Sequence, residues 1–206
     1  MPAMLMLRKI LDEHGGVSEN SWRNITETSR LIRVKKQHTL LRSSENCQSV
    51  YFVIRGVFAN IHQEHHISPF IVRFNWEHQY LGDNLFMKDK PQLLDAISLT
   101  DSILIKTPLS TMSNSYSNDL QLRNTLNNLQ FNSINKLLSR NRQLLSDTRK
   151  RILEFTETHV AILNRVRKRE IASFLAVTPV TLSRLLAKNP NLAQQIKPPR
   201  INGVIS

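Results

Sequence analysis

Residues 167–186 read RKREIASFLAVTPVTLSRLL and carry the most specific spacing in the chain. Ala172 and Ala176 are small and four residues apart, which lets two helices cross closely. Thr178 is suited to cap the second helix, and Pro179 then takes its first position, where a missing N–H costs nothing. Glycine is usual in such a turn where this chain has Ala176, so a left-handed conformation there costs more. The spacing predicts a helix-turn-helix.

The second helix of this pair is expected to bring short polar residues to a DNA groove. Arg184 shares a helix face with Val180 and Thr181 and is long enough to reach guanine O6 and N7 with both arms of its fork. Many helix pairs have small-residue spacing without touching DNA, but the cap and the basic flank favour a DNA-reading motif. The residues expected to contact DNA are Lys168, Arg169, Thr178, Val180, Thr181, Ser183, Arg184, Lys188 and Arg200.

A short wing is expected to follow the helix pair. Gln195–Lys197 and Gly203–Ile205 are suited to form a β-hairpin, with Arg200 reaching a phosphate. Pro198 and Pro199 interrupt the hairpin and predict a short or distorted wing.

Basic residues concentrate in the same part of the chain. The formal net charge is +12, and residues 140–206 hold 13 Lys and Arg against 4 Asp and Glu, a charge of +9. Residues 1–139 carry the remaining +3. A basic C-terminal third indicates a polyanion such as nucleic acid, although a solvated surface kept for solubility has the same composition.

Upstream of the helix pair, residues 118–145 contain no Pro or Gly and predict one long helix. Its apolar stripe needs a partner, which is either the chain's own N-terminal domain or a second copy of the helix. We favour a dimer seam with a polar gap at Ser133. A further helix is expected from Asp147, as its cap, to His159, and the cations at 149–151 in its first turn fit nearby phosphates. The seam residues are expected to be Leu122, Leu126, Leu129 and Leu137.

The N-terminal half alternates short β-prone runs with polar turns. Helices are expected at residues 4–12 and 22–29, the second capped by Asn20 or Ser21. Gly56 separates two of the runs, where a tight turn needs a residue without Cβ. Such short, evenly spaced strands predict a sandwich or jelly-roll barrel. The runs are 31–34, 39–42, 49–54, 57–61, 70–74, 96–99 and 103–105.

The order of these parts resembles the cyclic-AMP receptor protein/Fnr superfamily of bacterial regulators. Residues 50–57, VYFVIRGV, look like the first half of that family's β-roll, and Gly82-Asp83 looks like its Gly-acid pair. The resemblance implies an α+β fold with a cyclic-nucleotide-binding-like β-roll domain at 1–115, a dimerisation helix at 116–146 and a winged helix-turn-helix DNA-binding domain at 147–206. It implies double-stranded DNA, a second copy of the chain and RNA polymerase as partners.

Departures from that family argue against several of the ligands that its members bind. Members that bind cyclic nucleotides place an Arg and a small hydroxyl residue after the Gly-acid pair, whereas residues 91–95 are PQLLD, with no cation and with Asp95 to repel a phosphate. The single Cys47 cannot supply the cysteines of the iron–sulfur type and fits a reducing cytoplasm. His62, His65 and His66 are interpreted as a solvated loop. We therefore expect no cyclic-nucleotide control, no cofactor and no metal.

These observations favour a homodimeric, sequence-specific DNA-binding transcription regulator in the cytoplasm. Charges interrupt every apolar run before it reaches a membrane-spanning length, so no membrane partner is expected. No nucleophile motif, phosphate loop or paired carboxylates indicate an enzyme. The alternative is a protein-interaction module that uses the β-roll and retains a vestigial helix-turn-helix.

Overall fold

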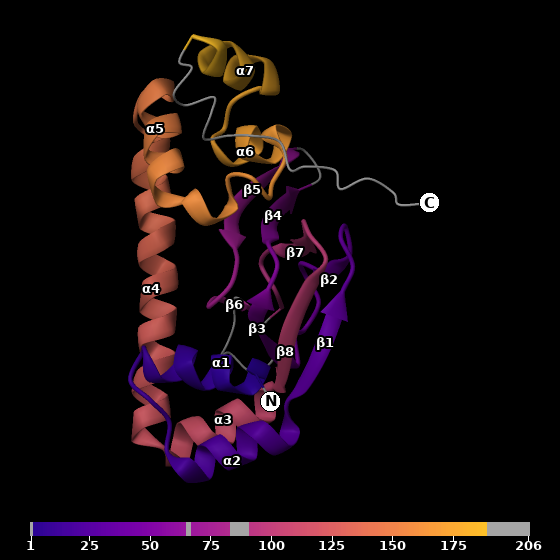
Figure 1. Ribbon diagram of the computed structural model, residues 1–206, viewed down its shortest axis with the longest axis vertical. Helices are drawn as coiled ribbons and strands as arrows, with labels where there is room; N and C mark the ends of the chain where they lie inside the picture. Colours follow the sequence, from indigo (N-terminus) through magenta and orange to yellow (C-terminus); the bar gives the residue numbers. More distant parts are fainter. Residues whose placement is uncertain (1, 65–66, 83–90, 189–206) are drawn as a thin grey trace. The chain divides into compact units, whose positions relative to one another are not determined.

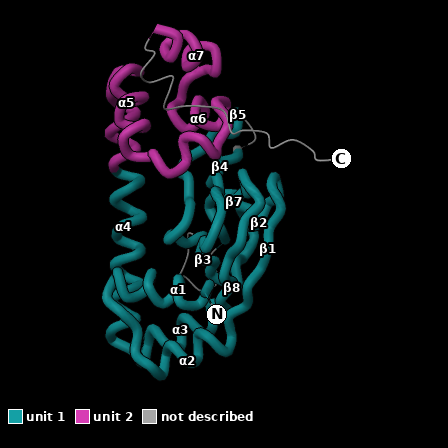
Figure 2. The backbone as a smooth tube through the Cα atoms, viewed as in Figure 1, with its two compact units in different colours: residues 1–138 teal, residues 139–206 magenta. Residues whose placement is uncertain are grey.

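The structure is a computed structural model that describes residues 2–64, 67–82 and 91–188. The chain divides into two compact units, residues 1–138 and 139–206 (Figure 2). The boundary falls within one long helix, α4 (Leu120–Leu144), so that its last six residues belong to the second unit.

The first unit contains two four-stranded antiparallel sheets, as the short β-prone runs predict (Figure 1). One sheet has the order β1-β8-β3-β6 and the other β2-β7-β4-β5. Strands that follow one another in the sequence often lie in different sheets, which is the arrangement of a β-roll. The strands are β1 (Arg30–Val34), β2 (Thr39–Leu41), β3 (Ser49–Arg55), β4 (Phe58–Glu64), β5 (Ile67–Asn75), β6 (Tyr80–Leu81), β7 (Asp95–Ser98) and β8 (Ser102–Pro108).

Strand β3 is buried on both of its faces. Tyr51 and Val53 pack between the two sheets, whereas Val50 and Phe52 point to the opposite side and join a cluster with the helices. Alternate side chains of a strand face opposite ways, so an uninterrupted apolar run fits a strand covered on both sides. Gly56 ends this strand as expected: its φ is +125°, and a Cβ there would lie 2.0 Å from Ser102 Oγ.

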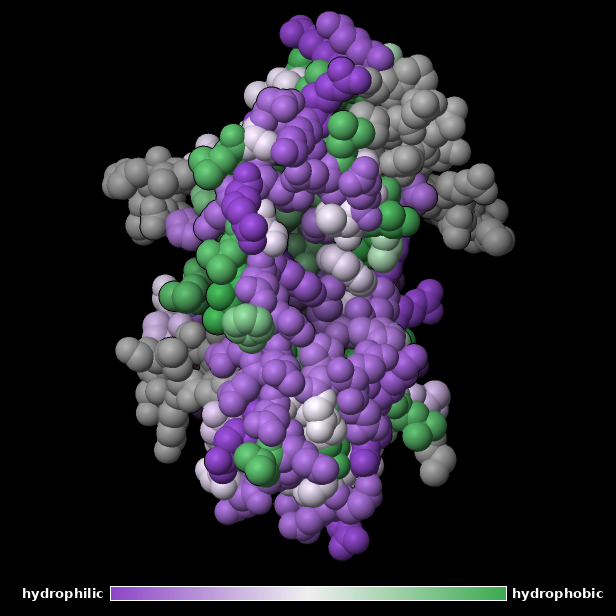
Figure 3. All heavy atoms as spheres, turned by 90° about the vertical axis from the view of Figure 1, so that its left-hand side faces the viewer, coloured by the Kyte–Doolittle hydropathy of each residue, from purple (hydrophilic) through white to green (hydrophobic). Residues whose placement is uncertain are grey.

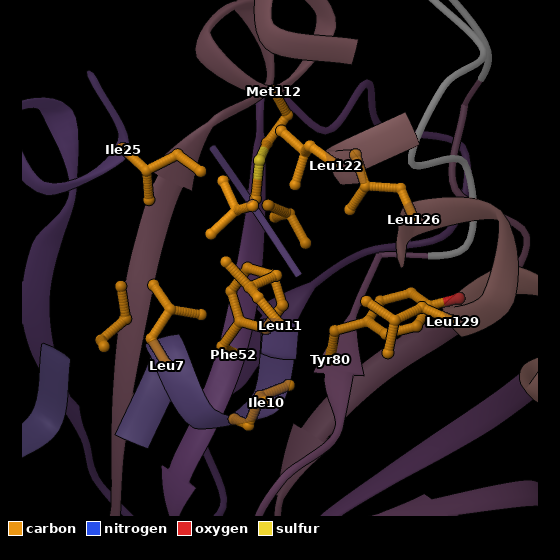
Figure 4. Close-up of a cluster of buried hydrophobic side chains, with 13 residues drawn as sticks. Leu7, Ile10, Leu11, Ile25, Phe52, Tyr80, Met112, Leu122, Leu126 and Leu129 are labelled. Carbon is orange, nitrogen blue, oxygen red and sulfur yellow. The ribbon is translucent and has the colours of Figure 1, made fainter. Parts of the chain in front are cut away.

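Four helices cover the outer side of the first sheet. They are α1 (Pro2–Asp12), α2 (Glu19–Thr28), α3 (Leu109–Asn118) and the first part of α4. Their apolar residues meet Phe52 in one buried cluster (Figure 4). The predicted cap of α2 at Asn20 or Ser21 is wrong, because Ser18 is the N-cap and accepts a hydrogen bond from the Ser21 N–H. Helix α3 and strand β6 were not among the predicted elements.

The predicted dimer seam needs a correction. Leu122, Leu126 and Leu129 are buried in the helix-and-sheet cluster of their own chain, and Leu137 is half-buried. Ser133, the expected polar gap in the seam, accepts a hydrogen bond from Arg73 Nη1 of β5 at 2.5 Å. The periodicity correctly predicted one buried face of a helix. Its partner is the β-roll, because the outer face of β3 also needs apolar cover.

Asp119 joins the start of α4 to the start of α2. Its Oδ1 accepts the Leu122 N–H at 3.1 Å, and its Oδ2 accepts the Ser18 N–H at 3.0 Å and the Ser18 hydroxyl at 2.7 Å. Burial alone would raise the pKa of Asp119, but the hydrogen bonds from Ser18, Ser21 and Leu122 favour the charged form and lower the pKa to about 2.

Residues 139–188 of the second unit form helices joined by turns. After the end of α4 come α5 (Thr148–Thr158), a 3₁₀ turn (Val160–Ile162), α6 (Lys168–Phe174) and α7 (Pro179–Ala187). Asp147 caps α5 as predicted, by accepting the N–H groups of Arg149 and Lys150. The predicted wing, including Arg200, lies outside the described residues.

Across residues 2–64, 67–82 and 91–188, no single helix is long and apolar enough to cross a bilayer. Helices α6 and α7 meet that requirement only when joined, and they are bent by 105°.

We predict that Asp119→Asn destabilises the first unit by about 2 kcal/mol at pH 7, the size of the pKa shift. Because the folded pKa is lowered, the carboxylate stabilises the fold above its unfolded pKa near 3.8, and this contribution is lost as the pH falls through about 2. Urea unfolding followed by the fluorescence of Trp22 and Trp76 measures the difference between the two proteins.

The difference in unfolding free energy between the wild-type and Asp119→Asn proteins should therefore shrink between pH 4 and pH 2. Asp101→Asn is the control, because Asp101 is an exposed carboxylate that accepts the Lys36 N–H. A difference for Asp119→Asn that stays constant down to the acid limit would show that geometry rather than charge matters there.

Candidate nucleic-acid interface

The turn between α6 and α7 has a defined hydrogen-bond pattern. The Val177 N–H donates to the Ala172 carbonyl at 3.0 Å, and the Ala176 N–H donates to the Ser173 carbonyl at 3.2 Å. This is the Schellman pattern, which requires a left-handed residue after the helix. Ala176 adopts that conformation with φ +52°, so an alanine stands where glycine is preferred.

Helix α7 begins as its sequence predicts. Thr178 is the N-cap, and its Oγ1 accepts the Thr181 N–H at 3.0 Å, with Pro179 at the first helical position. The hydroxyl groups of Thr178 and Thr181 also lie 2.9 Å apart. The 105° bend from α6 to α7 lies within the range of helix-turn-helix pairs.

One face of α7 is buried and the opposite face is exposed. Leu182 and Leu186 are buried in the second unit, and Thr181 is half-buried. From Pro179 onward the exposed residues follow a spacing of one, three, one, three and one, so they lie along a single face of the helix. They are Pro179, Val180, Ser183, Arg184, Ala187 and Lys188.

The first turn of α6 adds cations to this unit. Lys168 and Arg169 are exposed, and Arg169 Nε lies 3.7 Å from the Glu170 carboxylate. The Glu170 carboxylate also accepts the Arg167 N–H, which completes the start of the helix. Between Ile171 and Lys188 the chain has no acidic residue. The expected DNA contacts from 168 to 188 are thus exposed except for the half-buried Thr181, and they are basic or polar except for Val180.

Two arginines have a role that the sequence did not indicate. Arg151 was interpreted with its neighbours as a cation for phosphates, but its Nη1 donates to the Leu175 carbonyl at 2.9 Å. Arg140, in the last part of α4, donates from Nη2 to the Phe174 carbonyl at 3.2 Å. Arg149 and Lys150 are exposed. A cluster of cations in a sequence does not reveal which of them turn back onto the protein.

The β-roll holds the residues considered from the sequence for binding a nucleotide, a metal ion or an iron–sulfur cluster. Asp95 is buried at the start of β7 and accepts the Ser43 N–H at 2.6 Å. The expectation that His62 belongs to a solvated loop is wrong, because His62 lies in strand β4 and stacks on Phe70. Cys47 donates from Sγ to the Ser49 carbonyl at 2.8 Å. Asp83, His65 and His66 lie outside the described residues. Within the described residues, no group of three His, Cys, Asp or Glu side chains is placed to hold a metal ion.

Solved structures of other proteins have a similar architecture, although no sequence comparison finds a match. No family model and no curated protein matches the sequence. The solved structure of FixK2 from Bradyrhizobium japonicum matches with a TM-score of 0.70 and 17% identity, covering 80% of this chain and 86% of that one. A transcriptional regulator of the Crp/Fnr family from Eubacterium rectale matches with a TM-score of 0.70 and 14% identity, covering 85% and 84%.

A third solved structure has the same architecture. The c-di-GMP-responsive global regulator CLP from Xanthomonas campestris matches with a TM-score of 0.64 and 15% identity, covering 84% of this chain and 92% of that one. These matches extend over most of both chains and agree with the two antiparallel sheets and the helices described above. The chain has the α+β fold of the Crp/Fnr regulators.

Proposed function

We propose that this chain is a transcription regulator that binds specific DNA sequences as a homodimer without cyclic-nucleotide control. The exposed face of α7 is the observation that carries the proposal. It presents Arg184, Lys188 and the short Ser183 side chain, with no carboxylate on the helix to repel DNA. Solved structures with the same fold include proteins described as transcriptional and global regulators, which supports regulation as the role.

In this proposal α7 lies in the major groove. Arg184 reads guanine with two parallel hydrogen bonds, and the exposed Val180 meets a thymine methyl group. Lys168 and Arg169 contact phosphates, which position the helix without reading sequence. Thr178 and Thr181 contribute through the cap that fixes the start of α7, since their hydroxyl groups already bond to each other. Arg200 remains an expected phosphate contact. The proposed site of action is the cytoplasm, where bacterial DNA is.

The dimer is proposed to form through the face of α4 that points away from the β-roll. Phe131, Ile134 and Leu138 have exposed fractions of 63%, 52% and 50%, which is unusual for three large apolar residues on one helix. Figure 3 views the side of the molecule that carries α4, where apolar groups interrupt a hydrophilic surface. These residues continue a repeat of alternating threes and fours: Leu120, Asn124, Asn127, Phe131, Ile134, Leu138 and Asn141.

A second copy of the chain is the partner that this repeat fits. Spacings of three and four keep a seam facing a like helix, and asparagine at seam positions selects the register and the number of strands. All seven seam residues are exposed in the single chain. Two copies also supply two α7 helices for the half-sites of a symmetric operator.

The β-roll supports the absence of cyclic-nucleotide control. Residues 91–95 provide no cation for a cyclic phosphate, and the buried Asp95 carboxylate would repel one. Asp95 already holds the Ser43 N–H, so moving it to admit an anion would leave a buried donor without its acceptor.

Arg184→Ala tests the reading residue, on an operator that the wild-type protein selects from random duplex DNA. We predict a loss of about 1–3 kcal/mol on the operator, with relaxed preference at one base pair per half-site. Lys168→Ala is the matched change for a phosphate contact. It should weaken operator and scrambled DNA alike and reduce the salt slope by about one unit.

Fluorescence anisotropy across a salt series measures both quantities. If Arg184→Ala lowers both affinities equally, Arg184 is a phosphate contact and another residue reads the sequence. If the wild-type protein selects no sequence and binds DNA without salt dependence, the protein-interaction alternative takes its place.

Ile134→Asp tests the seam. A charge buried between two copies without a partner is costly, so the variant should sediment as a folded monomer and lose operator affinity. Asn132→Asp adds the same charge to an exposed position on the same helix, outside the repeat, and should leave the dimer intact. A dimeric Ile134→Asp protein in analytical ultracentrifugation would place the interface elsewhere.

Titration calorimetry with cyclic AMP and cyclic GMP tests the β-roll. We predict no saturable heat at micromolar concentrations and no change in operator affinity when either nucleotide is added. Saturable binding by either one contradicts the interpretation of residues 91–95.

A further inference from the structure

The C-terminal end of α6 has four carbonyl groups that its own helix cannot satisfy. The Schellman turn supplies donors for two of them, since Val177 bonds to Ala172 and Ala176 bonds to Ser173. The other two carbonyls, those of Phe174 and Leu175, face side chains from other helices. Both donors are arginines.

Arg140 reaches the Phe174 carbonyl from α4, and Arg151 reaches the Leu175 carbonyl from α5. Arg140 is only 8% exposed, and its guanidinium carbon lies 5.1 Å from the centre of the Phe174 ring. Arg151 is held by a second bond, from Nη2 to Thr148 Oγ1 at 3.0 Å. A guanidinium has five N–H donors in a fixed plane, so each arginine fixes the direction of the carbonyl that it meets.

The cations also suit the electrostatics of this site. The carbonyl end of a helix carries partial negative charge, which favours a cation there. The next residue, Ala176, adopts a left-handed conformation that costs more for alanine than for glycine. Two charge-assisted hydrogen bonds to the preceding carbonyls offset that cost and disfavour other conformations of the turn. The residues that follow are the cap and first turn of α7.

We propose that Arg140 and Arg151 are positioning residues for DNA recognition, which hold the α6 carbonyl end so that α7 leaves the turn in a fixed direction. This inference rests on the proposed function. It divides the basic residues of the second unit into two kinds. Lys168 and Arg184 face outward, whereas Arg140 and Arg151 are committed to the protein and contribute nothing to counterion release.

Arg140→Met and Arg151→Met remove the guanidinium and keep an unbranched side chain. We expect each to lower affinity for the selected operator about tenfold. Scrambled DNA should be bound within about twofold of the wild-type affinity, with an unchanged salt slope, because no phosphate contact is lost. Arg149→Met is the matched contrast: Arg149 is exposed in the same helical turn as Arg151, so as a cation for phosphates it should weaken both DNAs alike and lower the salt slope.

Two further changes separate positioning from loss of fold. Arg151→Lys retains a cationic donor and should recover part of the operator affinity. Ala176→Gly removes the cost of the left-handed turn, so in the Arg151→Met background it should also restore operator affinity. Recovery by a change at the turn itself is not expected if Arg151 contacts DNA. Circular dichroism of each variant verifies that the helices are present.

The outcomes distinguish this inference from the proposed function. Arginine variants that keep full operator affinity overturn the inference alone, and so does a parallel loss on both DNAs with a salt slope lower by about one unit. A wild-type protein that selects no operator overturns the proposed function. Amide hydrogen exchange at Ala176 and Val177 then still tests whether Arg140 and Arg151 hold the turn. Both arginine-to-methionine variants should exchange faster there than Arg149→Met.

Discussion

The leucine face of α4 and the outer face of β3 each require apolar cover, and each supplies it to the other. Leu122, Leu126 and Leu129 meet Phe52 in one cluster that also takes in α1 and α3. This contact fixes the rotation of α4 about its own axis. The opposite face, with Phe131 and Ile134, is therefore exposed, and the same helix carries Arg140 into the second unit.

Much of the fold was predictable because local signals agreed with the final structure. The alternating runs predicted seven of the eight strands found in the described residues. Gly56 marked its turn, and Thr178 and Asp147 cap the helices that their positions suggested. Strand β6 was not predicted because its two residues are too few to show an alternation of apolar and polar side chains. The cap of α2 was missed because Ser18 is held by Asp119, which lies 101 residues away in the chain.

In the candidate site, too, local patterns were predictable and contacts between distant segments were not. A helical period was sufficient to predict most of the exposed face of α7, although Thr181, expected on that face, is half-buried. The period of α4 was equally clear, but it fitted two possible partners, and only packing distinguishes a β-roll from a second copy. Arg140 and Arg151 were counted as charges. Their hydrogen bonds to backbone carbonyls depend on how three helices meet, which no single segment specifies.

The position of β3 has a consequence for synthesis on the ribosome. Its partner β8 follows about fifty residues later (Val50 pairs with Thr107), and the leucines that cover its outer face come later still. A nascent chain that has emerged only as far as β7 therefore holds an apolar strand whose one emerged neighbour in the sheet is the two-residue β6, and whose outer face lacks the leucines of α4. The first unit closes only when α4 has left the exit tunnel, whereas the second unit is built from contacts close in sequence and folds soon after it emerges.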